Sequence, residues 1–309
     1  MKLAAIDIGS NTIRLLVANV DGGEIVPLRH ERRVTRLASG LHINGAIFNE
    51  PLEATVNAVR EFTVLARQEG VQRIVMAGTS ALREASNALD AVRAIEDAAG
   101  LHLDIISGQM EAEIMSLGVL GGLGPVGRAI IFDIGGGSTE FIALNGKHVL
   151  KAITFPAGVV RLTEECILED PPSTADIERL DRQATLIAQD AREGLGGHVM
   201  NSDVLAGTAG TATTLASLDL ELTKYDWRKV QGHILTLERI RELETGIQQV
   251  SIDIRKKIKG MDPERTDLII AGTRLTIRIM EALDFSEMVV SDHGLLEGLI
   301  VKAHMETGQ

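Results

Sequence analysis

The apolar positions of the chain change their spacing repeatedly along its length. Short runs of Val, Ile, Leu and Ala alternate with longer segments in which apolar residues recur at helical spacing. The first pattern predicts strands and the second predicts helices, and their alternation is typical of an α/β protein. We expect strands at residues 2–9, 12–20, 71–78 and 102–107, in a hairpin-like series over 128–155, at the start of 202–211, and at 287–292. We expect helices at residues 50–69 with Asn49 as N-cap, from Thr79 or Ser80 onward, and at 108–120, 173–195, 212–218 and 294–306.

One part of this pattern occurs twice. The first strand ends in Asp7-Ile8-Gly9, and the same three residues recur as Asp133-Ile134-Gly135. A turn rich in hydroxyl and small residues follows each copy, and a second apolar strand follows each turn. Two copies are too few for a solenoid. The repeat therefore predicts a duplicated domain with a cleft between the two halves.

Composition and charge narrow the class of protein. The 309 residues are 45% hydrophobic and 24% charged, which is typical of a globular protein, and the formal net charge is −12. A protein that wraps a long nucleic acid needs a positive face, so this balance argues against such a partner. Cys166 is the only cysteine, which excludes an intrachain disulfide and favours the cytoplasm. The first apolar run is too short for a signal sequence. The sequence has no run of about 18 apolar residues, so it predicts no membrane span.

The two duplicated turns are candidate phosphate sites. Small residues at the tip of a strand–turn–strand expose backbone N–H groups, and such groups form anion-binding concavities. Ser10, Asn11 and Thr12 are the candidates in the first turn, and Gly136, Gly137, Ser138 and Thr139 are those in the second. Ordinary hairpin turns are the alternative interpretation, because Gly and Asn favour turns in any case. The paired occurrence favours the functional interpretation.

Asp7 and Asp133 each lie at the end of an apolar strand, where a carboxylate without a partner is costly. Mg²⁺ is a suitable partner, because it binds one or two carboxylates together with waters and substrate phosphate oxygens. Capping of the local turn is the alternative. The sequence alone does not choose between these two interpretations.

Three further charged residues are candidates for chemistry. Arg83 falls in the first turn of an expected helix, where the helix dipole disfavours a cation and a bound anion would explain it. An ion pair with Glu84 is the alternative. Glu111 lies at the start of the helix after Ser107, where carboxylates are common on protein surfaces. Glu140 follows the glycine turn in a segment that otherwise becomes apolar, so it is expected on the same side as Ser138.

The order of the motifs resembles one known family. The stretches DIGSNTIRLLV, GTSALREASN, ISGQMEAE, FDIGGGSTEF, FPAGVVRLTE, LAGTAGTATTLA and VSDHGLLEG are similar to motifs of the exopolyphosphatase/guanosine-pentaphosphate phosphohydrolase (Ppx/GppA) family. The resemblance implies the duplicated, actin-like ATPase or ribonuclease H-like fold of the sugar kinase/Hsp70/actin superfamily. It places one domain at residues 1–124 and a second at 125–293, and a last helix at about 294–307 packs back on the first.

The resemblance also assigns roles to the candidate residues. Asp7 and Asp133 match the carboxylates of the metal and phosphate loops, with Mg²⁺ or Mn²⁺ as the implied cofactor. Glu111 and Glu140 match the catalytic carboxylates, of which Glu111 would activate the attacking water. The matching phosphate-binding residues are Ser10, Asn11, Thr12, Arg83, Gly135, Gly136, Gly137 and Ser138, and Gly158 and Arg161 would complete the cleft.

The implied activity is release of terminal orthophosphate from inorganic polyphosphate or guanosine pentaphosphate, as in the stringent response, by a cytoplasmic protein that can form a homodimer. Two positions depart from the family pattern. Met110–Glu111 stands where two adjacent acids are usual, so the first acid is replaced by methionine, and Leu296 stands where the motif GLREG has an arginine. The missing arginine leaves room for a non-hydrolytic sensor of guanosine tetra- or pentaphosphate. A kinase of the same superfamily is a third hypothesis, although no acceptor domain is evident.

Overall fold

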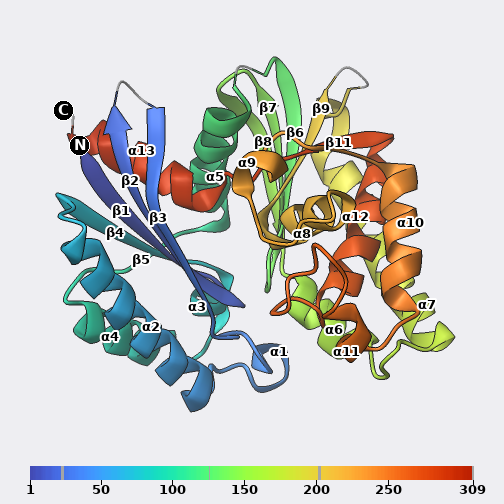
Figure 1. Ribbon diagram of the computed structural model, residues 1–309, viewed down its shortest axis with the longest axis horizontal. Coiled ribbons are helices and arrows are strands. Elements are labelled where there is room, and N and C mark those ends of the chain that lie inside the picture. The colour runs from blue at the N-terminus through green and yellow to red at the C-terminus, as the bar shows by residue number, and fades with distance from the viewer. Residues whose placement is uncertain (22–23, 125, 201–202, 308–309) are drawn as a thin grey trace. The chain divides into compact units, whose positions relative to one another are not determined.

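The computed structural model describes residues 1–21, 24–124, 126–200 and 203–307 (Figure 1). The chain divides into two compact units, each with its own sheet. Unit 1 comprises Met1–Gly121 and His293–Gln309, and unit 2 comprises Gly122–Asp292. The sequence placed these divisions near residues 124 and 293, and residue 125 lies outside the described residues.

Unit 1 contains a five-stranded sheet in the order β3-β2-β1-β4-β5. Strands β1 to β3 form an antiparallel meander, whereas β4 and β5 continue in parallel with β1. The strands are β1 (Lys2–Ile8), β2 (Thr12–Asp21), β3 (Glu24–Val34), β4 (Arg73–Gly78) and β5 (Asp104–Ile105). The helices are α1 (Leu41–Asn44), α2 (Asn49–Gln68), α3 (Ser80–Glu84), α4 (Ala88–Ala99), α5 (Gly108–Leu123) and α13 (Leu295–Thr307).

Both faces of this sheet are covered. One face packs Ile6, Leu15 and Val17 against residues of α2 and α4, including Phe62 and Ile95. The other face packs β1 and β2 against α13, through a cluster that contains Leu3, Ala5, Leu16, Leu296, Leu299 and Ile300. Burial on both sides explains why β1 reads as a nearly continuous apolar run rather than an alternating one.

Helices α5 and α13 approach each other through glycine. A Cβ atom on Gly118 would lie 1.9 Å from the carbonyl oxygen of Gly294. A Cβ atom on Gly298 would lie 1.8 Å from the carbonyl oxygen of Ile114. Only glycine allows this contact, because any side chain at either position would separate the two helices.

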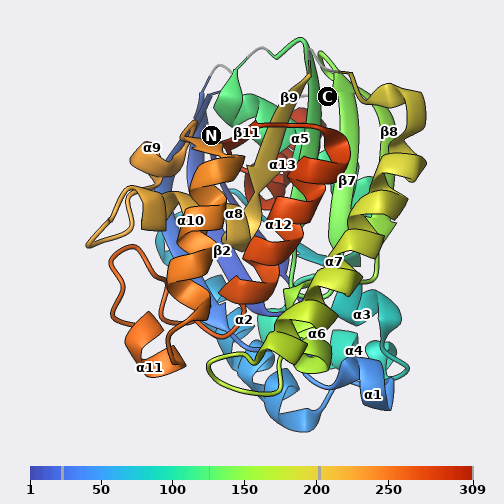
Figure 2. The ribbon, with the colours of Figure 1, turned by 90° about the vertical axis from the view of Figure 1, so that its right-hand side faces the viewer.

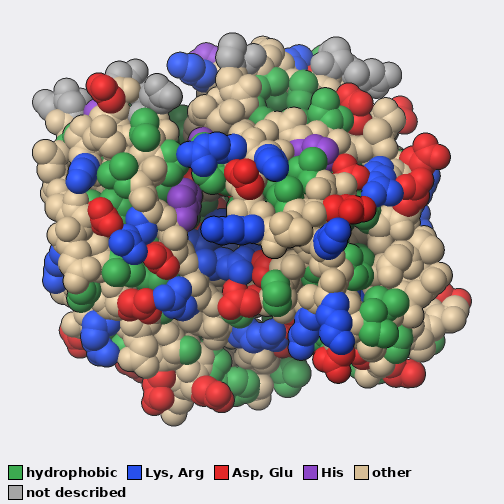
Figure 3. All heavy atoms as spheres, viewed as in Figure 1, with side chains coloured by type: hydrophobic (Ala, Val, Ile, Leu, Met, Phe, Trp, Pro, Cys, Tyr) green, Lys and Arg blue, Asp and Glu red, His purple; other side chains and the backbone are tan. Residues whose placement is uncertain are grey.

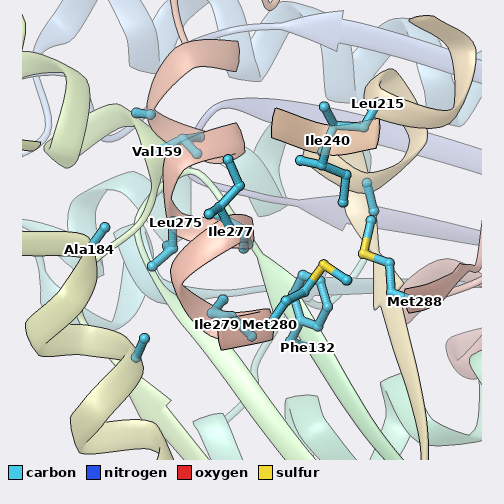
Figure 4. Packing of buried hydrophobic residues seen from close by; sticks show 14 of the residues in the cluster. Phe132, Val159, Ala184, Leu215, Ile240, Leu275, Ile277, Ile279, Met280 and Met288 are labelled. Carbon is cyan, nitrogen blue, oxygen red and sulfur yellow. The ribbon is translucent and has the colours of Figure 1, made fainter. Parts of the chain in front are cut away.

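Unit 2 contains a six-stranded sheet in the order β10-β11-β9-β6-β7-β8. Its strands are β6 (Arg128–Ile134), β7 (Thr139–Asn145), β8 (His148–Phe155), β9 (Val204–Thr208), β10 (Ile234–Thr236) and β11 (Glu287–Val290). Its helices are α6 (Val159–Cys166), α7 (Thr174–Leu195), η1 (Gly196–His198), α8 (Ala209–Asp219), α9 (Trp227–Val230), α10 (Leu237–Gln248), α11 (Ile252–Arg255) and α12 (Ile269–Leu283). Helices α7 and α12 lie side by side across this sheet (Figure 2). Figure 4 shows the underlying core, in which Met280 of α12 lies beside Phe132 of β6.

The two sheets repeat one arrangement of strands. The order β3-β2-β1-β4 in unit 1 corresponds to β8-β7-β6-β9 in unit 2, with antiparallel pairing up to β1 or β6 and parallel pairing after it. The hairpin register is also the same, because Asp7 faces Arg14 and Asp133 faces Glu140 at equivalent places. The Asp-Ile-Gly repeat in the sequence thus marks a structural duplication.

Two local expectations were wrong. Helix α2 begins at Asn49 itself, and its N-cap is Phe48, which provides no side-chain cap. The helix expected after Thr79 is broken into α3 and α4. The break has a tertiary cause, because Ser86 N donates to Gly45 O and the Asn87 side chain bonds both Ile47 N and Ile47 O.

Acidic and basic side chains are interspersed over the face of the molecule shown in Figure 3. Among the helices of the described residues, none is long and apolar enough to span a lipid bilayer.

Candidate functional site

The tip of the β1–β2 hairpin combines a closed turn with two backbone amides that are not used within the described residues. Gly9 N closes the turn by donating to Thr12 O at 3.1 Å. The carbonyls of Ser10 and Asn11 are occupied, because Ala38 N donates to Ser10 O at 2.8 Å while the amides of residues 35 and 36 donate to Asn11 O. Within the described residues, the amides of Ser10 and Asn11 have no acceptor. Amides arranged in this way can bind an anion.

The tip of the β6–β7 hairpin is closed by the equivalent hydrogen bond. Gly135 N donates to Ser138 O at 2.9 Å, and the first amides of α6, those of residues 159 and 160, donate to the carbonyls of Gly135 and Gly136. In the described part of the chain, the amides of Gly136, Gly137 and Ser138 have no acceptor. The duplication therefore extends to the bond that closes each turn, and both tips present backbone donors.

Glycine at position 158 is required for this second tip. A Cβ atom there would lie 2.4 Å from both the carbonyl carbon and oxygen of Gly136. The chain before α6 therefore packs directly on the turn and holds its carbonyls in place. Arg161, the other residue expected nearby, is partly exposed and bonds Glu165 and Pro156 O instead.

Asp7 is buried and held by an arginine on the neighbouring strand. Arg14 donates to Asp7 Oδ2 from Nε at 3.0 Å and from Nη2 at 2.6 Å. Asp7 Oδ1 is also buried and has no hydrogen-bond partner among the described residues. Buried polar atoms are normally paired, so this oxygen is a candidate to receive a water or a cation.

Asp133 occupies the equivalent position in unit 2, but a carboxylate faces it. Asp133 and Glu140 are directly opposite in the β6–β7 register and are only 8% and 2% exposed. Like charges that face each other across a ladder destabilise it unless a cation or a proton compensates. The residue opposite the aspartate is therefore positively charged in the first hairpin, where it is Arg14, and acidic in the second, where it is Glu140.

Arg83 and Glu111 form a hydrogen-bonded unit in unit 1. Arg83 Nη1 donates to Glu111 Oε2 at 2.6 Å and to Ile106 O at 2.9 Å. Glu111 is 6% exposed and lies in the first turn of α5, where Ser107 Oγ accepts from Met110 N. The ion pair expected as an alternative, with Glu84, is thus not the one that Arg83 makes. The Nε and Nη2 edge of the guanidinium makes no hydrogen bond with the described residues and retains the fork geometry that suits a phosphate.

Ser80 was not predicted as a site residue, although it lies within this cluster. Its Oγ atom lies 2.7 Å from Ser10 Oγ, and both side chains are buried. The sequence signal was its place in the motif GTSALREA, three residues before Arg83. Arg14 was missed as well, and its signal was the hairpin register that places it opposite Asp7.

The structure brings the predicted residues together within each unit. Unit 1 gathers Asp7, Ser10, Asn11, Thr12, Arg83 and Glu111, and unit 2 gathers Asp133, Gly135, Gly136, Gly137, Ser138 and Glu140. Their catalytic, phosphate-binding and metal-binding roles remain predictions. The described residues contain no group of three or more His, Cys, Asp or Glu side chains that could hold a metal ion. A metal at either aspartate would therefore need waters or substrate oxygens to complete its coordination.

The two positions that depart from the family pattern have different environments. Met110 is 41% exposed on α5. Leu296 is 4% exposed and packs with Leu3 and Leu16 between α13 and the sheet. The position at which the motif GLREG carries an arginine is therefore part of the apolar core of unit 1 in this chain.

Comparison with known proteins shows the family. Residues 16–306 match the model of the Ppx/GppA phosphatase family. Exopolyphosphatase 2 of Mycobacterium tuberculosis (strain ATCC 25618 / H37Rv) is 30% identical over 314 aligned residues, which cover 96% of this chain and 97% of that protein. Exopolyphosphatase 1 of Mycobacterium leprae is 28% identical and covers 98% of this chain and 89% of its own length.

Solved structures agree with this match. The Ppx/GppA family member of Aquifex aeolicus has a TM-score of 0.85 at 28% identity and covers 100% of this chain and 99% of its own. An exopolyphosphatase from Cytophaga hutchinsonii has a TM-score of 0.89 at 25% identity, with 100% and 98% covered. The ethanolamine utilization protein EutJ of Carboxydothermus hydrogenoformans shares the fold alone, with a TM-score of 0.50 at 13% identity over 97% of this chain and 88% of its own. The predicted actin-like α/β fold class is confirmed. The chain belongs to the Ppx/GppA phosphatase family.

Proposed function

We propose that this protein is a phosphoanhydride hydrolase that releases terminal orthophosphate from inorganic polyphosphate, from guanosine pentaphosphate, or from both. The observation that carries the proposal is the Arg83–Glu111 pair beside a hairpin tip whose amides lack acceptors. These groups are a buried carboxylate, a cation and oriented backbone donors. Phosphoryl transfer depends mainly on such positioning and on electrostatic stabilisation. The exopolyphosphatase names of the relatives support the same activity.

Glu111 is the proposed general base. Its carboxylate would accept a proton from the attacking water while the water oxygen forms the new bond to the terminal phosphorus. The bond between that phosphorus and the bridging oxygen would break, and the shortened chain would leave with the bond's electron pair. The free edge of Arg83 and the amides of the β1–β2 tip would bind the oxygens on which negative charge accumulates. Glu140 is proposed as a second essential carboxylate.

A divalent cation, Mg²⁺ or Mn²⁺, is proposed as the cofactor. Asp7 in unit 1 and Asp133 in unit 2 are the proposed carboxylate ligands, and two observations fit this proposal. Asp7 Oδ1 and Asn11 Oδ1 are buried oxygens without a hydrogen-bond partner among the described residues, and Asp133 and Glu140 face each other as carboxylates. Carboxylate and amide oxygens are suitable ligands for such an ion. When bound, the ion would neutralise charge on the phosphate oxygens.

The test is phosphate release from polyphosphates of graded length and from guanosine pentaphosphate, with and without divalent metal. The wild type is compared with Glu111→Gln and with a matched control, Glu113→Gln, which changes the neighbouring carboxylate that bonds Gln109. We expect Glu111→Gln to lower kcat by about a hundredfold or more, and Glu113→Gln to leave it unchanged. Equal activity of Glu111→Gln and wild type would remove Glu111 from the mechanism.

The sensor hypothesis is decided by the same experiment. The hypothesis is prompted by Leu296 at the position of the family arginine, and in this chain that position belongs to the apolar core of unit 1. Tight binding of guanosine tetraphosphate, with no phosphate released from any polyphosphate, would assign the protein as a sensor. Phosphate release that requires an added acceptor and ATP would instead assign it as a kinase.

A further inference from the structure

The starting observation is a pair of buried hydroxyls that joins two segments of unit 1. Ser10 lies at the tip of the β1–β2 hairpin, and Ser80 is the first residue of α3 after β4. Their Oγ atoms are 2.7 Å apart, and the two residues are 4% and 2% exposed. No other hydrogen bond involves either hydroxyl within the described residues. The pair is therefore isolated from the remaining side chains of the site.

Counting hydrogens shows that this pair is incomplete. Each serine hydroxyl carries one hydrogen, and a bond between two hydroxyls uses only one of them. Whichever serine donates, the hydrogen of the other has no acceptor in the described structure. A buried donor without an acceptor is unfavourable, so such a group calls for a specific explanation, such as a bound ligand or water.

The surroundings indicate what kind of ligand would complete the pair. The amides of Ser10 and Asn11 also lack acceptors in the described part of the chain, and Ser80 lies on the same short helix as Arg83. Backbone amides, a hydroxyl and a guanidinium edge are all donors. A group that offers only acceptor oxygens, such as a phosphate, satisfies all of them at once.

We propose that Ser80 is a further substrate-binding residue, which acts with Ser10 as a hydroxyl pair that donates one hydrogen bond to a phosphate oxygen of the substrate. This inference rests on the proposed function for the class of ligand. It adds Ser80 to the proposed phosphate-binding residues and makes Ser10 and Ser80 one unit, because their hydroxyls share a single hydrogen bond. Loss of either hydroxyl removes the arrangement that orients the remaining hydrogen.

The test measures binding rather than turnover. Inorganic tripolyphosphate is titrated by calorimetry into Glu111→Gln protein and into the same protein carrying Ser80→Ala, Ser10→Ala or both. Ser116→Ala is the matched control, because Ser116 is a buried serine of unit 1 whose hydroxyl donates to Glu113 O within its own helix. We expect each site variant to raise Kd about tenfold, the double variant to match the single variants, and the control to stay within twofold.

A thermal unfolding scan without ligand separates binding from folding. Ser80→Ala removes one hydroxyl–hydroxyl hydrogen bond and leaves one unpaired hydroxyl hydrogen, as in its parent, so its Tm should fall only slightly while the affinity for tripolyphosphate falls. An unchanged Kd for Ser80→Ala, or multiplicative losses in the double variant, would overturn the inference and leave the proposed function intact. Absence of tripolyphosphate binding by Glu111→Gln protein that still folds would instead count against the proposed function, and the inference would fall with it.

Discussion

Arg83 Nη1 donates a 2.6 Å hydrogen bond to Glu111 Oε2 and thereby joins the end of helix α3 to the first turn of helix α5. The same nitrogen also bonds Ile106 O. Two bonds from one nitrogen fix the plane of the guanidinium, so the orientation of the carboxylate depends on an arginine that still has an edge available for phosphate.

This relationship predicts that Arg83 and Glu111 act as one functional unit. In a double-mutant cycle, Arg83→Gln should lower kcat by about tenfold or more in the wild-type background and much less in the Glu111→Gln background. The measurement is phosphate release under saturating substrate. Arg93→Gln, at an exposed position of α4, is the control and should leave kcat unchanged. Independent, multiplicative effects would show that Arg83 serves phosphate binding alone.

A second prediction concerns the contact between Gly158 and the second hairpin tip. Gly158→Ala places a methyl group 2.4 Å from the Gly136 carbonyl, so the turn must move. We expect a loss of about 1–3 kcal/mol in the free energy of unfolding and a loss of phosphate release. Gly246→Ala is the control. Gly246 lies at an exposed position of α10 with nothing within 4 Å of the added Cβ, so the change should stabilise the protein by about 0.5–1 kcal/mol. Equal stability of the two variants would contradict the close approach.

A third prediction concerns pH and the capping box of α7. Ser173 and Asp176 cap each other, and Asp176 is 2% exposed. Burial disfavours its ionisation, but hydrogen bonds from Ser173 and Glu169 outweigh this effect and lower the pKa of Asp176. A lowered folded-state pKa gives stability that is present above the unfolded pKa of about 3.9 and is lost as the pH falls through the folded value.

The measurement for this third prediction is the midpoint of denaturant unfolding. Asp176→Asn should be less stable than wild type by about 1 kcal/mol at pH 7, and the difference should shrink in strong acid. Asp190→Asn, at an exposed position of the same helix, should show no such dependence. If the difference in stability between wild type and Asp176→Asn grew as the pH fell, the pKa of Asp176 would not be lowered by folding.

A fourth prediction concerns Cys166. This thiol is 1% exposed, and burial raises its pKa, with the charge of Glu165 adding to the effect. Thiolates are the reactive form, so the native protein should not react with a disulfide reagent such as Ellman's reagent at neutral pH. Unfolding in denaturant should release one reactive thiol per chain. Rapid stoichiometric reaction of the native protein would show that this part of α6 opens.

The fold could be predicted from the sequence because its determinants are local. Strand and helix periods, together with the repeat of Asp-Ile-Gly, indicated a duplicated α/β protein, and both the fold class and the family are confirmed. The residues at each hairpin tip are adjacent in sequence, so a motif is enough to find them. Their chemical roles stay predictions.

The features that could not be predicted from the sequence depend on contacts between separate segments of the chain. Arg14 faces Asp7 through strand register, and Ser80 meets Ser10 because β1 and β4 are neighbours in the sheet. The helix after Thr79 is interrupted because Asn87 bonds Ile47. None of these partners can be identified from spacing alone, because the residues are brought together by pairing between separate elements.

The place of α13 in the fold has a consequence for how the chain folds as it is made. Leu3, Ala5 and Leu16 belong to strands that are translated before unit 2, yet part of their apolar cover is helix α13, which is translated after unit 2. Unit 2 is continuous in sequence and can complete its core while one face of the first sheet is still partly uncovered. Until α13 has been made, that face of the first sheet remains partly uncovered, and exposed apolar surface of this kind makes a folding intermediate prone to aggregate.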